Sequence, residues 1–92
     1  MDLKRLIASS CRQKILEALS QVGQTYVMDL VRKVNSDYTQ ISRNVAILAR
    51  EGVVIGEACG RVRMIRLNKE NPKTIALLKA LEILRKQEFL EK

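Results

Sequence analysis

The chain has 92 residues, of which 47% are hydrophobic and 29% are charged, a balance typical of one folded domain rather than of a disordered chain. No apolar run approaches the roughly 20 residues of a membrane-spanning helix, and the first residues lack the apolar core of a secretion signal, so we expect a cytoplasmic protein without a membrane partner. Seventeen Lys and Arg against ten Asp and Glu give a net charge of +7, which favours polyanions as partners; the alternative is that this charge serves solubility only.

The composition provides few residues suited to metal binding or to acid-base catalysis. The chain contains no histidine, and its two cysteines, Cys11 and Cys59, are far apart in the sequence. A structural zinc site normally needs four Cys or His ligands, and the general base of an enzyme is most often His. The sequence therefore predicts no metal, no cofactor and no enzyme activity, and we interpret both thiols as buried or incidental.

Two helices are expected before the central part of the chain. Residues 2–7 have the pattern of a short helix, and a cap at Ser9 or Ser10 precedes a second helix over residues 11–22. Residues 24–26 then form an extended link or a single pairing strand. The spacing i, i+1, i+4, i+7 indicates the core-facing side of the second helix, made by Ile15, Leu16, Leu19 and Val22.

A helix-turn-helix is predicted next. The helical period returns at Val27 and ends at Asn35, a residue suited to a left-handed cap. Ser36 makes a tight turn, and another helix begins at once over residues 38–51. Two short helices joined by about three residues form a helix-turn-helix, in which the second helix projects outward.

The helix over residues 38–51 carries the clearest signals in the chain. Asp37 caps its first turn, Gln40 is placed to complete a capping box, and Gly52 provides the stop. At about 100° per residue, one side is apolar and the opposite side is basic, polar and slim at its middle. The inward residues are Ile41, Val45 and Leu48, and the outward residues are Thr39, Arg43, Ala46 and Arg50. Such an outer side fits the major groove of DNA.

A β-hairpin and a final helix complete the pattern. Two strands, up to residue 58 and from residue 61, flank a turn at Cys59 and Gly60, with Ile65 and Leu67 expected over the core. Asn71 then caps a helix that starts at Pro72 and runs over residues 72–91.

The final helix has more apolar surface than one contact needs. Its apolar residues spread over some two-thirds of the circumference, whereas a surface helix offers its own core about 100°. We infer two contacts, one with the domain core and one with the same helix of a second chain. The expected dimer interface comprises Leu77, Leu81 and Leu84; the alternative is a helix wrapped wholly by its own domain.

The order helix, helix, turn, helix, hairpin, helix resembles the winged helix-turn-helix transcription regulators, most closely the arsenical-resistance-repressor (ArsR-like) branch. The similarity covers roughly residues 9–68. Residues 11–16 match the family's arginine and Ile-Leu pattern, and residues 29–34 match its acidic-Leu helix. Residues 40–54 match its recognition helix, and residues 60–68 match its wing. The resemblance implies a winged helix-turn-helix. Together with the chain length and the apolar final helix, we expect one domain over residues 1–92, mainly α with a small β-hairpin and a C-terminal dimerisation helix.

The chain departs from this family at particular positions. Ser36 stands where a hydrophobic residue is usual, and Val31 where a small alanine is usual. The paired cysteines and the acid-and-histidine sets of the metal-sensing members are absent. The resemblance thus implies the fold and double-stranded DNA as partner, and it leaves any signal unassigned.

The resemblance also implies the DNA-binding residues, because the N-terminal part of a recognition helix enters the major groove. Candidates for contact with base edges are Tyr38, Thr39, Gln40 and Arg43, of which Arg43 pairs well with guanine and Gln40 with adenine. Candidates for contact with phosphates are Ser42, Asn44, Arg50, Arg61 and Arg63. The alternatives are packing in the turn for Tyr38 and a solvated ion pair for Arg50.

We therefore expect a homodimeric, sequence-specific transcription regulator, with helix 38–51 in the major groove and wing 59–63 on the backbone. Two such helices about 34 Å apart would meet a roughly palindromic site. The alternatives are a chromosome-organising protein without sequence preference and a winged-helix module that docks other proteins. A further hypothesis is that Cys59, at the wing tip beside Arg61, is open to oxidation.

Overall fold

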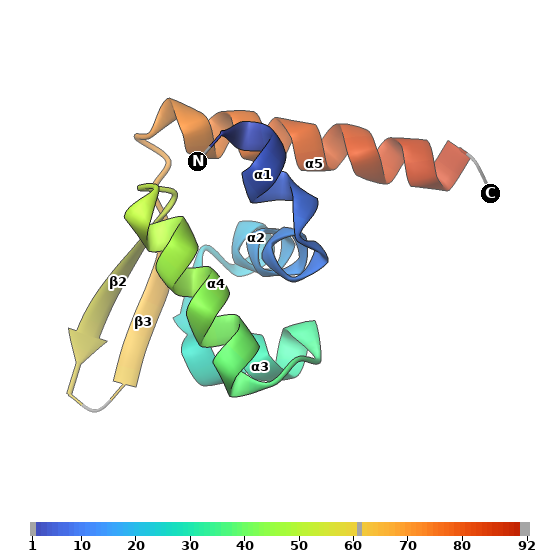
Figure 1. Ribbon diagram of the computed structural model, residues 1–92. Coiled ribbons are helices and arrows are strands. Elements are labelled where there is room, and N and C mark those ends of the chain that lie inside the picture. The colour runs from blue at the N-terminus through green and yellow to red at the C-terminus, as the bar shows by residue number, and fades with distance from the viewer. Residues whose placement is uncertain (1, 61, 91–92) are drawn as a thin grey trace.

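The computed structural model describes residues 2–60 and 62–90, without the side chains of Cys59 and residues 88–90. Within these residues, five helices and three strands follow one another, and Figure 1 shows their arrangement. They are α1 (Leu3–Ala8), α2 (Ser10–Val22), β1 (Gln24–Tyr26), α3 (Val27–Val34), α4 (Tyr38–Arg50), β2 (Val54–Cys59), β3 (Val62–Leu67) and α5 (Pro72–Leu90). α5 lies across one end of the molecule, and α3 and the N-terminal end of α4 lie at the other (Figure 1). No helix in these ranges is long and apolar enough to span a membrane.

The first two helices begin at side-chain caps. Asp2 Oδ1 accepts a hydrogen bond from Arg5 N at 2.9 Å, and Ser9 Oγ accepts one from Arg12 N at 3.3 Å, so each cap satisfies a backbone N–H that the helix leaves free. The predicted core side of α2 is confirmed at Ile15, Leu16 and Leu19, which are fully buried. The prediction is wrong for Val22, which is 43% exposed because it lies in the last turn, beside Gly23.

The helix-turn-helix is formed by α3 and α4. Asn35 has φ 56° and ψ 51°, the predicted left-handed cap, and Ser36 N donates to Val31 O at 3.3 Å. Asp37 Oδ1 accepts from Gln40 N at 2.7 Å and so starts α4 as predicted. α4 ends at Arg50, one residue earlier than expected.

The three strands form one antiparallel sheet in the order β1-β3-β2, so the expected hairpin is joined by the pairing strand that was one of the two possibilities for residues 24–26. Thr25 is paired with Ile65, so the short segment 24–26 is a true strand beside β3. The other edge of β3 pairs with β2 along its whole length, from Val54 opposite Leu67 to the turn. Ile65 is fully buried and Leu67 nearly so, which confirms that the base of the hairpin lies over the core.

Two buried residues of α5 correct the expected dimer interface. Leu77 and Leu81 are 1% and 3% exposed and belong to the protomer's own hydrophobic core. They are one helical turn apart, so both face α1 and α2. Ile83 follows Leu81 by two residues, about 200° round the helix, and it is 61% exposed. Leu84 is partly exposed, at 37%.

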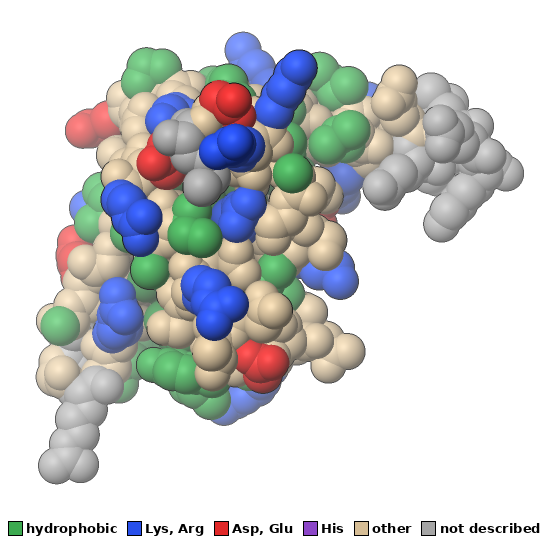
Figure 2. Space-filling view, in the orientation of Figure 1, with side chains coloured by type: hydrophobic (Ala, Val, Ile, Leu, Met, Phe, Trp, Pro, Cys, Tyr) green, Lys and Arg blue, Asp and Glu red, His purple; other side chains and the backbone are tan. Residues whose placement is uncertain are grey.

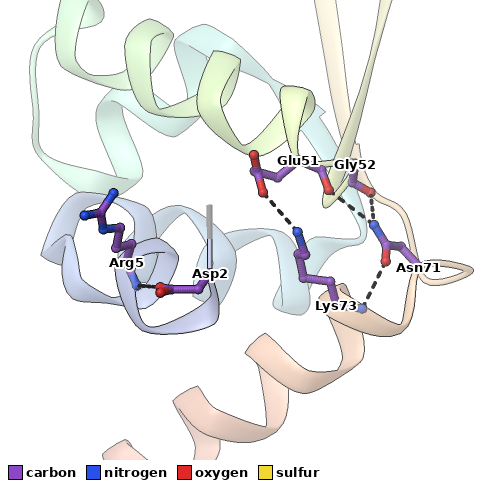
Figure 3. Close-up of polar contacts among 6 residues, drawn as sticks. All are labelled: Asp2, Arg5, Glu51, Gly52, Asn71 and Lys73. Carbon is purple, nitrogen blue, oxygen red and sulfur yellow. Dashed lines mark hydrogen bonds and ion pairs between the residues drawn. The ribbon is translucent and has the colours of Figure 1, made fainter.

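The start of α5 is bonded to the end of α4 (Figure 3). Asn71 Oδ1 accepts from Lys73 N at 3.0 Å, the predicted cap of α5, while Asn71 Nδ2 donates to Gly52 O at 3.0 Å and Glu51 O at 3.3 Å. Asn68 Nδ2 also donates to Gly52 O, at 3.0 Å. We call this set of bonds the α4–α5 junction. It satisfies the carbonyl groups of Glu51 and Gly52, the two residues that follow α4.

Gly52 is required at this junction. Its φ is +76°, and a Cβ at this position would lie 2.9 Å from Asn71 Nδ2. Next to it, Lys73 Nζ lies 2.9 Å from Glu51 Oε1, and this hydrogen bond lowers the pKa of the Glu51 carboxyl from its ordinary value of 4.5. The junction therefore combines backbone capping with an ion pair.

Candidate nucleic-acid interface

α4 presents a basic and polar strip to solvent. Thr39, Arg43, Ala46 and Arg50 are all exposed, as predicted, and they succeed one another at intervals of three or four residues along one side of the helix. The opposite side is closed by the buried core residues of α4. Because the helix contains no Asp or Glu, the strip offers donors and positive charge without an opposing acid of its own. Figure 2 views the molecule from this side and shows Lys and Arg side chains over α4 and the hairpin.

The four candidates for base contact lie together at the N-terminal end of α4. Tyr38 is 51% exposed, so it does not pack inside the turn. Thr39, Gln40 and Arg43 are exposed as well. This end of the helix points away from α5 (Figure 1) and is open to a partner.

The candidates for phosphate contact are placed less uniformly. Ser42 is half-buried at the flank of α4, and Arg50 and Arg63 are exposed. Arg63 projects from β3, where its guanidinium lies beside Gly56 of β2. Arg61 and the side chain of Cys59 are outside the described residues, and so are the two predictions that depend on them.

Asn44 does not face outward, and its assignment to phosphate is corrected. Its side chain is 5% exposed, because it lies one turn from Ile41 and from Leu48 on the inner side of α4. Asn44 Oδ1 accepts a hydrogen bond from Arg12 Nη1 at 2.9 Å. Asn44 Nδ2 donates to Gln40 O at 2.9 Å and, over a longer 3.4 Å, to Gln40 Oε1. The predicted reach of Gln40 back to the cap is thus replaced by a contact with Asn44.

Arg12 joins three helices through one guanidinium group. Besides its bond to Asn44, it donates through Nε to Leu6 O at 2.9 Å and through Nη2 to Arg5 O at 2.7 Å. Both acceptors are backbone carbonyls of the short helix α1, whose last carbonyls have few helical partners. A half-buried side chain of α2 therefore ties α1 to the inner side of α4.

Sequence reasoning assigned Arg12 no functional position, although a signal was present. Arg12 precedes Ile15 by three residues and therefore continues the core-facing side of α2, while Asn44 interrupts the apolar side of α4. The guanidinium group of Arg12 can only donate hydrogen bonds, and the side-chain amide of Asn44 has an oxygen that accepts them. Such a pair indicates a contact, but periodicity cannot say that the two meet.

Metal ligands do not cluster in the part of the chain that the structure describes. No group of three His, Cys, Asp or Glu side chains within residues 2–60 and 62–90 is close enough to hold a metal ion. Cys11 is half-buried and forms no disulfide. Asp29 accepts a hydrogen bond from Thr25 Oγ1, and Lys33 Nζ lies 3.4 Å from Asp29 Oδ2. These two contacts lower the pKa of the Asp29 carboxyl from its ordinary value of 3.8. The bond to Thr25 makes Asp29 part of the β1–α3 contact.

Solved structures with the same arrangement are known. The antimony-specific transcriptional repressor AntR is 26% identical, with 97% of this chain and 77% of that chain aligned and a TM-score of 0.80. A possible transcriptional regulator for arsenical resistance is 27% identical over 88% of this chain and 80% of that one, with a TM-score of 0.71. A homodimeric winged helix-turn-helix domain of Mb0332 from Mycobacterium bovis, a possible ArsR-family regulator, is 20% identical over 98% and 81%, with a TM-score of 0.76.

No protein-family model and no curated protein sequence matches the chain, so the likeness is carried by structure. The arrangement of α3, α4 and the hairpin confirms the fold expected from the sequence, and the AntR and arsenical-resistance structures confirm the resemblance to the ArsR-like branch. The chain thus has a winged helix-turn-helix fold and resembles the ArsR-like transcription regulators.

Proposed function

We propose that this protein binds double-stranded DNA sequence-specifically as a homodimeric transcription regulator. The observation that carries the proposal is the outer strip of α4, exposed along its length, free of acids and flanked by the hairpin. A major groove is wide enough for such a helix, and the phosphates beside it attract the positive charge. The AntR and arsenical-resistance structures, which are named as a transcriptional repressor and a possible regulator, support the same class.

In this proposal, α4 and the wing have different roles. Tyr38, Thr39, Gln40 and Arg43 meet base edges, because a recognition helix contacts bases through its N-terminal half. Arg43 carries the largest share, since its guanidinium can donate two parallel hydrogen bonds to guanine. The phosphate contacts come from Ser42, Arg50, Arg63 and, outside the described residues, Arg61.

The second chain of the dimer covers apolar side chains of α1 and α5. Leu3 and Ile75 are 41% and 39% exposed, and Ile83 and Leu84 are exposed in the distal part of α5. That part of α5 extends beyond the other helices (Figure 1), and every residue from 82 to 87 is exposed. An isolated helical extension gains little stability in water, whereas the same extension packed on a twin helix buries these side chains.

Fluorescence-anisotropy titration tests the proposal. The purified protein is titrated with about 30 bp duplexes, selected from a random library or unrelated, and with one single strand, from 50 to 300 mM salt. We expect tight binding to duplex, a steep fall with salt that counts the phosphate contacts, and an advantage for the selected duplexes. Equal affinity for all duplexes would indicate a chromosome-organising protein instead. Weak binding throughout at low salt would indicate that α4 docks a protein.

A further inference from the structure

The inner side of α4 contains a chain of hydrogen bonds whose direction is fixed by chemistry. Arg12 has five N–H donors and no acceptor. The Asn44 atom that lies 2.9 Å from Arg12 Nη1 must therefore be the carbonyl oxygen, Oδ1. The donor-only character of Arg12 thus sets which way the Asn44 amide faces.

The Asn44 amide in turn sets which way the Gln40 amide faces. With Oδ1 at Arg12, Asn44 Nδ2 is left to face Gln40, where it lies 2.9 Å from the backbone oxygen and 3.4 Å from Oε1. If the Gln40 amide were turned over, its NH₂ group would face the Asn44 NH₂ group, two donors without an acceptor between them. The oxygen of the Gln40 side chain therefore faces inward and its NH₂ group is left for the exposed side.

Arg12 and Asn44 are themselves held firmly. Asn44 is 5% exposed, and Arg12 is anchored at two further points by the carbonyl groups of Arg5 and Leu6 in α1. Gln40, by contrast, is exposed at the N-terminal end of α4. Arg12 and Asn44 are therefore fixed inside the protein, whereas the side chain of Gln40 is accessible to a partner.

We propose that Arg12 and Asn44 are positioning residues that orient Gln40 as a hydrogen-bond donor toward a DNA base, so that Gln40 selects guanine. This inference rests on the proposed function, because it needs α4 in a major groove. Guanine presents two acceptors there, N7 and O6, whereas adenine presents one acceptor and one donor. The bidentate pairing of Gln40 with adenine that the sequence suggested requires the side-chain oxygen to face outward, and Asn44 holds that oxygen inward.

Selection of binding sites from a random duplex library tests the proposal. Gln40→Ala identifies the base position that depends on Gln40, and the wild-type protein is expected to prefer guanine to adenine there by about tenfold, the size of one good base contact. In Asn44→Asp, the carboxylate keeps the contact with Arg12 and loses both donations to Gln40. Its second oxygen can accept only from the Gln40 NH₂ group, so the amide turns over. This variant is expected to lose the guanine preference and to favour adenine or cytosine, whose amino groups are donors.

Two further variants separate positioning from stability. Asn44→Ala and Arg12→Met, which has no N–H donor for Asn44 Oδ1, release the Gln40 amide, and their guanine-to-adenine ratio is expected to fall toward one. Asn68→Ala is the matched control, because Asn68 Nδ2 also donates to a backbone carbonyl, that of Gly52, at the other end of α4. It is expected to lower the unfolding temperature and to leave the base preference unchanged.

The outcomes distinguish this inference from the proposed function. If the wild-type protein enriches no sequence, the proposed function is overturned and the role of Gln40 with it. If it enriches sites in which the Gln40-dependent position is adenine, or if the guanine preference survives in Asn44→Ala and Asn44→Asp, the orientation alone is overturned and Asn44 is a stability residue. A selected site that does not depend on Gln40 at any position overturns the orientation in the same way.

Discussion

Arg43 occupies the middle of the exposed strip of α4, with Thr39 one turn before it and Ala46 one turn after it. Ala46 keeps the helix surface low beside it, so that the backbone can come close to a groove. An arginine in this place has room to extend and no acid of α4 to pair with. Its contribution can therefore be measured with little interference from its neighbours.

For Arg43→Ala, we expect binding to a selected duplex to weaken by about 1 to 3 kcal/mol, the value of one bidentate base contact. Binding to unrelated duplexes should weaken less, because only one charge is lost. Arg43→Lys, which keeps the charge but lacks the fork of donors, should also lose the preference. Anisotropy titration of both duplexes at one salt concentration measures the two losses. Equal losses would remove Arg43 from the base contacts.

The contact between Glu51 and Lys73 predicts that the stability of the fold depends on pH. Its pKa is lowered in the folded protein by the hydrogen bond from Lys73, so the unfolded chain takes up a proton more readily than the folded one near the ordinary 4.5. The stabilisation is therefore complete above that value and is lost as the pH falls through the lower, folded pKa. Asp29 acts in the same direction from its ordinary 3.8.

We expect the unfolding temperature to fall as the pH is lowered from 6 to 3, and to fall less steeply in Glu51→Gln. Thermal unfolding followed by circular dichroism at several pH values measures both slopes. Parallel slopes for the two proteins would mean that the Lys73–Glu51 pair does not contribute. Lys86, which pairs with Glu82 at 3.5 Å on the exposed part of α5, provides the control variant Lys86→Met, because an exposed pair contributes little.

At this scale, the sequence predicted most of the exposed residues of α4 and failed at Asn44. Periodicity places a residue on one side of a helix, and the residue type was then used to judge whether that side is exposed to solvent. Asn44 is polar, yet the donors of Arg12, 32 residues earlier, give it a partner inside the protein. Neither residue reveals the other without the fold, because the contact depends on how α1, α2 and α4 pack.

Among the secondary-structure elements, the α4–α5 junction differs from an ordinary helix cap. A capping residue usually serves one helix, whereas Asn71 accepts from the first turn of α5 and donates to the carbonyl groups of the two residues that follow α4. The buried hydroxyl of Thr74 adds a bond to Val53 O at 3.3 Å. The end of one helix and the start of the next are therefore satisfied by the same few side chains.

We expect Asn71→Ala to lower the free energy of unfolding by about 2 kcal/mol, at the upper end of the range for a lost N-cap, because two carbonyl groups also lose a donor. Asn71→Ser keeps a capping acceptor for Lys73 N and loses only the donors to Glu51 O and Gly52 O, so its loss should be smaller. Urea unfolding of the two variants and the wild type gives the values. An alanine variant as stable as the serine variant would show that the cap of α5 contributes nothing.

The elements themselves were largely predictable, because their ends carry local signals. Asp37 and Asn71 cap helices as predicted, and Gly23 and Asn35 adopt the positive φ that ends helices. The pairing of Gln24–Tyr26 with β3 was left open, since three residues have no period and their partner lies far along the chain. The buried side of α5 was chosen wrongly, because apolar residues around most of a helix do not reveal which of them meet the core.

At the scale of the whole molecule, α5 gives the protein its elongated form, 44 Å in the longest direction and 22 Å in the shortest. The N-terminal part of α5 belongs to the core through Leu77 and Leu81. The distal part extends beyond α2 and carries Ile83 and Leu84 (Figure 1). This division explains how one helix can be apolar around most of its circumference.

For Ile83→Glu combined with Leu84→Glu, we expect the dimer to dissociate at concentrations where the wild type is dimeric, because charge would be buried against a twin helix. Sedimentation equilibrium measures the mass directly. Met28→Glu is the matched control, since Met28 is 50% exposed on α3 and away from α5. A monomeric wild type, or a variant as dimeric as the wild type, would contradict the assignment of this surface.

The position of β3 between β1 and β2 also bears on how the chain folds as it is synthesised. β1 is made early, yet its partner Ile65 emerges only after the whole of α3, α4 and β2. Contacts between such distant segments form late, because a long loop must close first. Asn71, which bonds the carbonyl group of Gly52 just after α4, emerges later still. The surface formed by the middle of the chain is therefore completed only when the chain has been made as far as Asn71.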